Sequence, residues 1–377
     1  MASQQRNGGS DEGARARRAA REQQARKAKK KNKLGIFGIE LAVIVAMVCV
    51  LIFVMKNTSS EGPSYTVLEA ENVAINEKVM AEKQEGGTMH GYMNVALFGV
   101  DATSKNQLYK GSRSDSIMIA SINLDTGDIK LVSVYRDTYL NLGNDTYSKC
   151  NAAYAKGGAE QAVKMLNMNL DMDIENFITV GYMGLKEVID GLGGIYLDID
   201  ETELKHINNY KITIAKDYKI GYNEVTHTGY QLVDGLQAAA YCRIRYGGGD
   251  DFKRAERQRE VIKAIEDQAK KTDLGTLTKT FNEAVDDIYM SFSSDYVLEM
   301  LKDIAKYKIV DENGFPQETL RTVGNIGAKG SCIVPRDLTA NVVWLHQFLF
   351  EDQNYEVTTD VKQYNEKIKS DTDKYVE

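Results

Sequence analysis

Histidine and cysteine are rare in this chain, with four of each among 377 residues. No two cysteines form a CxxC pair, and the histidines are scattered along the sequence. Tetrahedral zinc sites need closely spaced ligands of these two types, so the sequence argues against a zinc centre. The chain also contains no internal repeat.

Arginine is scarce as well, and it is distributed unevenly. Beyond Lys56 there are 26 lysines but only nine arginines, and five of the nine lie between Arg243 and Arg259. Lysine therefore serves the ordinary solvated surface. A guanidinium grips phosphate through two parallel hydrogen bonds, whereas an ammonium acts as a point charge. The bias predicts a phosphate-binding site in this segment.

The pattern around these arginines predicts a strand, a turn and a helix. Residues 241–246 alternate as a strand does, residues 247–249 are three glycines that let the chain reverse, and a helical period begins at Asp251. The polar side chains expected to converge are Arg243, Arg245, Arg254, Arg257 and Gln258. The alternative is a solvated basic helix face. That alternative does not explain Arg243 and Arg245, because a buried strand must supply partners for charges.

The N-terminal part is first basic and then apolar. Residues 1–33 contain eleven Lys or Arg against three Asp or Glu and no aromatic residue, which predicts a disordered tail. Residues 34–55 are 22 residues with one acidic group, Glu40, which is long enough for one transmembrane helix. The run is too long for a signal-peptide core, and no small-x-small cleavage site ends it. The positive charge predicts a cytoplasmic tail with the rest outside the cell.

The remaining chain is acidic. Removing the tail's net +8 from the overall −7 leaves about −15 for the other residues. A phosphate site would then be a local positive pocket on an acidic body, which argues against nucleic acid as a partner. For the tail itself, contact with anionic lipid is favoured, because it lacks aromatic residues and adjoins the membrane.

The exterior part alternates between strand and helix patterns. Residues 56–90 are polar and predict a stalk, and strands are predicted at 94–101, 115–124, 129–137, 176–182 and 195–200. Helices are predicted at 152–169 and 185–192. This alternation predicts an α/β domain over residues 91–272, with a mixed central sheet flanked by helices. Residues 273–377 contain helical patterns at 293–307 and 337–352 and predict an extension packed on the same domain.

Acidic residues and arginines recur at the predicted strand ends. They are Asp101, Arg113 with Asp115, and Arg136 with Asp137. Each pair alone is compatible with a plain salt bridge. Together they predict a metal-bridged diphosphate site, because Mg²⁺ takes one or two carboxylates and keeps phosphate oxygens as its other ligands. Arginines then neutralise charge that develops on the phosphoryl group.

Six ordered motifs resemble the LytR-CpsA-Psr family of Gram-positive cell-envelope proteins. The motifs are FGVD, RSDS, SVYRDT, KCNAAYAKGG, VIDGLGGIYLDI, and YCRIR followed by DDFKRAERQR. The resemblance covers roughly residues 92–270 and extends to the short tail and single span. It implies Mg²⁺-assisted transfer of a glycopolymer from an undecaprenyl-pyrophosphate carrier to a peptidoglycan hydroxyl, with a phosphodiester formed.

The resemblance also implies residue roles. Asp101 and Asp115 correspond to metal ligands, Asp251 to the general base, and Asn151 to a residue near the phosphates. Pyrophosphate is expected at Arg113, Arg136, Arg243 and Arg245, with Arg254, Arg257 and Gln258 completing the pocket. The prenyl tail is expected in an apolar channel whose candidates are Phe177, Ile178, Val180, Met183, Leu185, Val188, Ile189 and Leu192. Ordinary core packing is the alternative for each of these eight.

Three cysteines lie in the exterior part. Cys150 and Cys242 directly precede Asn151 and Arg243, so a shared pocket would bring them near each other, and we expect a disulfide with Cys332 unpaired. The alternative is buried free thiols. Two other functions stay open: a non-catalytic binder of lipid-linked precursors, and a lipid-pyrophosphate hydrolase. The sequence does not distinguish teichoic acid from capsule or another wall polymer.

Overall fold

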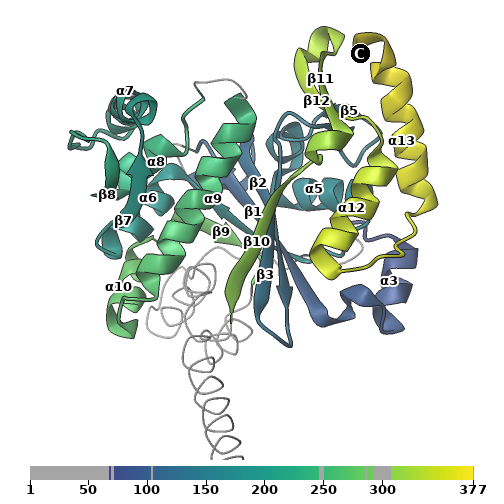
Figure 1. Cartoon of the computed structure of the whole chain (residues 1–377), viewed down its shortest axis with the longest axis horizontal. Helices are drawn as coiled ribbons and strands as arrows, with labels where there is room; N and C mark the ends of the chain where they lie inside the picture. Colours follow the sequence, from purple (N-terminus) through teal and green to yellow (C-terminus); the bar gives the residue numbers. More distant parts are fainter. Residues whose placement is uncertain are drawn as a thin grey trace, which may run out of the picture.

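The computed structural model describes residues 68, 72–102, 105–245, 250–284, 287–292 and 307–376. Its centre is a six-stranded sheet in the order β10-β3-β2-β1-β6-β9 (Figure 1). The strands are β1 (Tyr92–Val100), β2 (Ser114–Asn123), β3 (Asp128–Val134), β6 (Asn176–Val180), β9 (Ile288–Met290) and β10 (Lys308–Phe315). β1 runs antiparallel to β2 and parallel to β6, so the sheet is mixed. This confirms the predicted α/β domain.

Helices cover both faces of the sheet, as Figure 1 shows. In β1, Val95 belongs to one buried apolar cluster, whereas Phe98 belongs to the other, as the two-residue period of a strand requires. One face packs against α6 (Tyr182–Gly191), α8 (Gly235–Tyr241), α9 (Asp250–Ala269) and α10 (Leu274–Ala284). The other packs against α5 (Ala152–Leu170), α12 (Leu338–Phe350) and α13 (Thr359–Thr372).

The strand directions bring several predicted site residues to one edge of the sheet, namely the edge at which β1 and β3 end and β2 begins. Because β1 and β2 are antiparallel, the end of β1 lies beside the start of β2, and Val100 pairs with Ser114. Asp101 and Asp115 follow these two residues. β3 is antiparallel to β2, so its end, which leads to Arg136, lies at the same edge. α9 also begins there, which explains how distant motifs form one site.

The prediction of a strand at residues 241–246 is wrong. α8 ends at Tyr241, and Arg243 and Arg245 lie in the chain that follows it. The helix forms because Asp234 and Gln237 make a capping box at its start, and because residues 238–240 are alanines, the best helix former. The glycines at 247–249 lie outside the described residues.

The predicted strand at 195–200 exists as β7 (Ile195–Ile199) but lies outside the central sheet. It pairs with β8 (Gly229–Val233) in a separate two-stranded antiparallel sheet, which we call the β7–β8 sheet. α7 (Glu201–Tyr218) connects the two strands and contacts α8. A further short pair, β4 (Tyr139–Asn141) and β5 (Tyr147–Lys149), precedes α5.

The C-terminal part contributes strands as well as helices. β9 and β10 are the two outermost strands of the central sheet, and β11 (Arg321–Asn325) pairs with β12 (Ser331–Pro335). The predicted helix at 337–352 is confirmed as α12. The predicted helix at 293–307 lies outside the described residues, apart from residue 307.

The segment predicted as a stalk lies against the domain over residues 72–91. Val73 and Val79 are fully buried there, and α3 (Glu77–Gln84) packs near the C-terminal helices. Lys78 donates to the carbonyl oxygen of Glu356 over 2.7 Å. The predicted membrane span at 34–55 falls outside the described residues. Within the described ranges, no helix combines the length and apolar character needed to cross a bilayer.

Candidate active site

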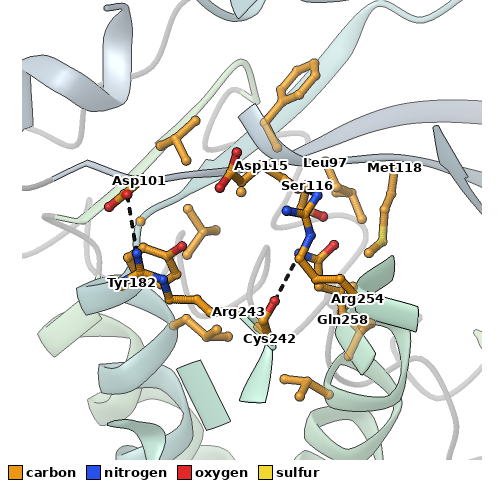
Figure 2. A pocket seen from close by; sticks show the side chains of 18 of the residues that line it. Leu97, Asp101, Asp115, Ser116, Met118, Tyr182, Cys242, Arg243, Arg254 and Gln258 are labelled. Carbon is orange, nitrogen blue, oxygen red and sulfur yellow. Dashed lines mark hydrogen bonds and ion pairs between the residues drawn. The ribbon is translucent and has the colours of Figure 1, made fainter. Parts of the chain in front are cut away.

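A cavity of about 440 Å³ lies between the central sheet and α9 (Figure 2). Its polar lining comes from the ends of β1 and β2, the segment after α8 and the first turns of α9: Asp101, Asp115, Arg243, Arg245, Arg254 and Gln258. Its apolar lining comes from β1, β2, β6, α6 and the middle of α9: Leu97, Met118, Ile178, Val180, Leu185, Val261, Ile262 and Ile265. The cavity therefore suits an amphiphile with an anionic head and a hydrocarbon tail.

Three arginines surround Asp115. Arg136 Nη1 lies 2.7 Å from Asp115 Oδ1, and Arg245 Nη2 lies 3.4 Å from Oδ2. Arg254 Nη2 donates to the backbone carbonyl oxygen of Asp115 over 3.0 Å. The carboxylate of Asp251 also contacts Arg254 and Arg136. Three guanidinium groups thus face the carboxylates of Asp115 and Asp251, and this excess of positive charge favours a bound polyanion.

Arg254 is the most buried of these arginines, with 4% of its surface exposed. Its Nε and Nη1 atoms are buried and have no hydrogen-bond partner among the residues that the structure describes. Burial lowers the pKa of Arg254, and the nearby Arg136 and Arg245 lower it further, against the opposite effect of Asp251. A buried cation with unused donors is costly unless it receives an anion, so Arg254 is a primary candidate for contacting phosphate.

Arg243 is held at the other side of the cavity by aromatic rings. Its guanidinium carbon lies 5.0 Å from the ring centroid of Tyr182 and 5.7 Å from that of Tyr210. Its Nη2 lies 3.8 Å from Asp101 Oδ2, and Figure 2 shows this contact. Cation–π contacts fix the plane of the guanidinium. The sequence analysis missed both tyrosines, although Tyr182 ends the strand predicted at 176–182 and could have been recognised as a strand-end residue; in the structure it is the first residue of α6.

Asp251 lies at the start of α9 among charged groups. Its Oδ1 is 3.2 Å from Arg254 Nη2 and 3.5 Å from Arg136 Nε. It also shares a hydrogen bond with Asp137, whose Oδ1 lies 3.3 Å from Lys149 Nζ. Burial raises the pKa of Asp251, but Arg254, Asp137 and Arg136 together bring it below the usual value.

Asp137 titrates in the opposite direction. Burial and the hydrogen bond with Asp251 raise the pKa of Asp137, despite the opposing effect of Arg136. When one proton is shared by the two carboxyl groups, it therefore resides on Asp137 and leaves Asp251 ionised. An ionised Asp251 can accept a proton from a hydroxyl at the cavity mouth.

An aromatic clamp holds the first turn of α9 in place. The rings of Tyr135 and Phe252 meet edge to face with centroids 4.7 Å apart. The guanidinium carbon of Arg321, at the start of β11, lies 3.9 Å from the Phe252 ring centroid and 5.0 Å from that of Tyr135. Arg321 Nη1 also donates to the Tyr135 hydroxyl over 3.2 Å. Because Phe252 directly follows Asp251, this clamp fixes where the carboxylate lies.

Five predicted site residues do not line the cavity. Two of them, Arg136 and Asp251, lie beside its polar end, where they contact Asp115 and Arg254. The other three lie elsewhere. Arg113 is exposed at the start of β2. Arg257 is buried, with its Nε 2.8 Å from Glu203 Oε1, and points away to α7. Asn151 is buried before α5, where its backbone N–H donates to the carbonyl of Arg136 over 3.1 Å. Its Oδ1 has no partner.

The apolar channel differs from its predicted lining. Of the eight candidates, only Ile178, Val180 and Leu185 line the cavity. Phe177 faces the other side of the sheet, because adjacent residues of a strand alternate. The other four do not line it: Met183, Val188, Ile189 and Leu192. The sequence analysis missed the α9 positions Val261, Ile262 and Ile265, which continue the face of Arg254 and Gln258 at helical spacing.

The expected disulfide is absent. Cys150, Cys242 and Cys332 are buried free thiols. Cys242 packs in the cluster on the α9 face of the sheet, and Cys150 packs in the cluster on the α5 face. The sheet thus separates the two sulfur atoms, even though each cysteine adjoins a residue near the same edge.

The carboxylates at the cavity fit a magnesium ion only as part of a larger ligand set. Across the described ranges, no group of three or more His, Cys, Asp or Glu residues could hold a metal. Asp101 and Asp115 both line the cavity, and the side chain of Asp101 is 49% exposed. Mg²⁺ usually binds one or two carboxylates and completes its shell with water and phosphate oxygens. These two residues fit that mode, with a diphosphate as the remaining ligand.

Comparisons with known proteins identify the family of this chain. The model of the LytR_cpsA_psr family matches residues 55–343. A polyisoprenyl-teichoic acid–peptidoglycan teichoic acid transferase TagU of Enterococcus faecalis is 34% identical, over 46% of this chain and 52% of that protein. A protein of the same name from Bacillus licheniformis is 30% identical, over 64% of this chain and 72% of that protein. The chain thus spans about half the length of the first of these relatives.

Solved structures share the fold. A structure titled "TagT bound to LI-WTA" matches with a TM-score of 0.53 and 23% identity, covering 70% of this chain and 92% of that one. The crystal structure of B. subtilis TagV matches with a TM-score of 0.54 and 22% identity, covering 71% and 98%. At this identity the likeness establishes the fold.

Proposed function

This chain belongs to the LytR-CpsA-Psr family, and we propose that it transfers a glycopolymer from a polyprenyl-pyrophosphate carrier to a hydroxyl of peptidoglycan. The observation that carries the proposal is the two-part cavity, with three arginines at one end and apolar side chains further in. That lining complements a pyrophosphate joined to a hydrocarbon chain. The relatives named as teichoic acid transferases favour a teichoic-acid-like polymer as the donor.

The proposed reaction is a phosphoryl transfer. An acceptor hydroxyl attacks the phosphorus atom that carries the glycopolymer, and a new phosphodiester forms. The bridging P–O bond breaks, and polyprenyl phosphate leaves. The hydroxyl proton passes to Asp251, whose pKa is lowered mainly by Arg254, against the opposing effect of burial. Arg136, Arg245 and Arg254 neutralise the charge that develops on the phosphoryl oxygens.

Asp101 and Asp115 would hold Mg²⁺ together with the diphosphate. The ion would supply further charge neutralisation at the bridging oxygen. In the described structure Asp115 is already paired with Arg136 and Arg245. Residues 34–55 would anchor the protein in the membrane, with the catalytic domain on the outer face, where both lipid carrier and peptidoglycan are accessible.

Reconstitution tests this function. Full-length protein in detergent is mixed with a polyprenyl-pyrophosphate-linked oligosaccharide and peptidoglycan, and covalently attached sugar and released polyprenyl phosphate are both measured. A transferase produces the two in equal amounts and only with peptidoglycan present. Release without peptidoglycan indicates a hydrolase, and tight donor binding with no release indicates a binder. Either outcome contradicts the proposal.

The metal assignment has its own test. Asp101→Asn and Asp115→Asn should each lower transfer at a fixed, limiting Mg²⁺ concentration, because they remove charge and not volume. Asp125→Asn, in the exposed turn between β2 and β3, is the matched control and should behave as the wild type. Transfer that continues at the full rate after chelation of all divalent cations would contradict the role of magnesium.

A further inference from the structure

A second hollow lies on the opposite side of α9 from the cavity. It has a volume of about 530 Å³ and is bounded by α9 and the β7–β8 sheet. We call it the α9 groove. In Figure 1 the β7–β8 sheet lies at the left of the molecule, beside α9. The proposed transfer reaction uses none of the side chains that line the α9 groove.

The β7–β8 sheet presents an aromatic surface at this groove. The exposed fractions of Tyr196, Tyr230 and Leu232 are 42%, 72% and 50%. Tyr196 on β7 pairs directly with Leu232 on β8. The rings of Tyr196 and Tyr230 stack with centroids 5.3 Å apart and an interplanar angle of 16°. Adjacent exposed apolar side chains are unfavourable in water and mark binding surfaces. Because the two rings stack on each other, Tyr196 supports one face of the Tyr230 ring, and Tyr230 is the more exposed of the two.

Polar groups surround this aromatic face. Carboxylates come from Asp198 and Asp200 on β7 and at the start of α7, and an amide comes from Gln268 on α9. A pyranose ring has an apolar C–H face and a rim of hydroxyl groups. The C–H face packs on an aromatic ring, and the hydroxyl groups bond to carboxylates and amides. The chemistry of the α9 groove therefore fits a sugar.

Charge selects the kind of sugar polymer. The acidic lining residues are Asp198, Asp200, Glu203, Glu260 and Asp267, and the basic ones are Lys263 and Lys271. The groove thus has excess negative charge, and the whole exterior part is acidic. A polymer with a phosphodiester backbone would be repelled at these distances. An uncharged glycan avoids this repulsion, which favours the acceptor over an anionic donor polymer.

The α9 groove is joined to the catalytic cavity through α9. Glu203 lines the groove and forms an ion pair with Arg257 over 2.8 Å. Gln258 lines the cavity, and Glu260, two residues later, lines the groove. At about 1.5 Å per residue, the lining residues on α9, from Glu260 to Gln268, lie roughly 14 to 26 Å along the helix from Asp251. A polymeric acceptor can span that distance, whereas a small acceptor cannot.

We propose that the α9 groove binds an uncharged glycan segment of the acceptor, with a sugar ring stacked on the open face of Tyr230, whose other face is supported by Tyr196. This subsite is remote from the reacting hydroxyl and would hold the polymer near the membrane-bound donor. The proposal deepens the transferase function and rests on it for the identity of the acceptor, but binding to the groove can be measured without transfer.

The experiment measures binding of N-acetylglucosamine tetrasaccharide to the full-length protein by the chemical-shift changes of the sugar or by calorimetry. Tyr230→Ala and Tyr196→Ala should weaken binding by roughly 3- to 10-fold each, as expected for an aromatic contact. Tyr375→Ala, a comparably exposed tyrosine near the C-terminus, is the matched control and should leave binding unchanged. Circular dichroism confirms that each variant is folded.

The outcomes separate the two proposals. Wild-type protein that does not bind the tetrasaccharide, or Tyr230→Ala protein that binds it as well as wild type, overturns the glycan site. Loss of binding to isolated teichoic acid or to phosphatidylglycerol vesicles in Tyr230→Ala, with sugar binding retained, would assign the surface to the donor or the membrane and also overturn it. Sugar binding that depends on both tyrosines, in a protein that transfers nothing, supports the site and refutes the transferase.

Discussion

Arg254 offers the sharpest test of the anion site, because two of its donors are unused. Arg254→Met removes the guanidinium while keeping a long unbranched side chain. In the wild type, burial and like charges disfavour the guanidinium, as its lowered pKa shows. The unused Nε and Nη1 atoms lie in a residue that lines the cavity. Arg254→Met also removes the contacts of Nη2 with the Asp115 carbonyl and the Asp251 carboxylate, so some loss of stability is expected. The loss of ligand affinity should be the effect that distinguishes it from other buried arginines.

The magnitude follows from the hydrogen bonds that a phosphate would receive. A hydrogen bond to a charged group contributes about 1.5 to 3 kcal/mol, so each lost contact weakens binding by roughly 10- to 150-fold. Arg254→Lys should recover only part of this loss, because an ammonium lacks the planar fork. Calorimetry with geranylgeranyl pyrophosphate and the full-length protein in detergent measures the affinity.

Arg259 provides a matched control on the same helix. It is also buried, but its Nε lies 3.3 Å from Glu312 Oε1 on β10, and its Nη1 donates to Ser133 Oγ over 2.9 Å. Arg259→Met should lower the free energy of unfolding by about 1 to 3 kcal/mol, because it leaves buried acceptors unpaired, and should leave affinity unchanged. If Arg254→Met binds the pyrophosphate as tightly as Arg259→Met does, the reasoning about unused donors is refuted.

Three further predictions concern the same domain. Asp251→Asn should keep donor affinity and lower the transfer rate by about 100-fold or more, since it removes a proton acceptor; a loss of affinity instead would argue against a general base. Arg321→Met opens the clamp on Phe252 and should lower the turnover number while leaving the donor dissociation constant within about twofold, which stopped-flow and equilibrium titrations distinguish. Burial raises the pKa of Glu266 from 4.5 to about 7, so the folded state binds more protons and the free energy of unfolding falls as pH rises between these values. Between pH 5 and pH 8, the free energy of unfolding measured in urea should fall on the order of 3 kcal/mol more in the wild type than in Glu266→Gln. An equal change with pH in the two proteins would contradict the raised pKa.

The strands at the centre of the sheet could be predicted because their sequences carry a strong pattern. β1, β2 and β3 are buried on both faces, and nearly all their residues are apolar or small. β10 could not be predicted in the same way. Its sequence KIVDENGF is half polar, because β10 is an outermost strand of the sheet and is exposed along one side. Its pairing with β3, 180 residues away in sequence, comes from tertiary structure.

The position of Arg243 and Arg245 was predicted better than their local structure. The two arginines spaced two residues apart and flanked by tyrosines resemble a strand, but the capping box at Asp234 starts a helix that uses the alanines before them. Both arginines still reach the cavity, because the end of α8 lies near the same edge of the sheet as the strand ends. The sequence therefore predicted that Arg243 and Arg245 reach one site, but it did not predict the backbone conformation of the segment that contains them.

The disulfide prediction failed for a related reason. Adjacency in sequence to a site residue fixes the position of a backbone atom to within about 4 Å, but not the side of the sheet to which the side chain points. Cys150 and Cys242 adjoin one edge and face opposite layers. Residue spacing alone carries no information on that choice.

The cluster of five arginines has two physical causes, only one of which the sequence analysis recognised. Arg243, Arg245 and Arg254 line the cavity. Arg257 and Arg259 instead fasten α9 on its two sides, the first to Glu203 near the start of α7 and the second to Glu312 in the central sheet. These partners lie 54 and 53 residues away, so no local pattern reveals them. Phosphoryl transfer depends on donors held in a fixed geometry, and a helix that presents Arg254 must itself be fixed. Arginines that never touch the ligand can thus be concentrated beside those that do, because they hold the same helix in place.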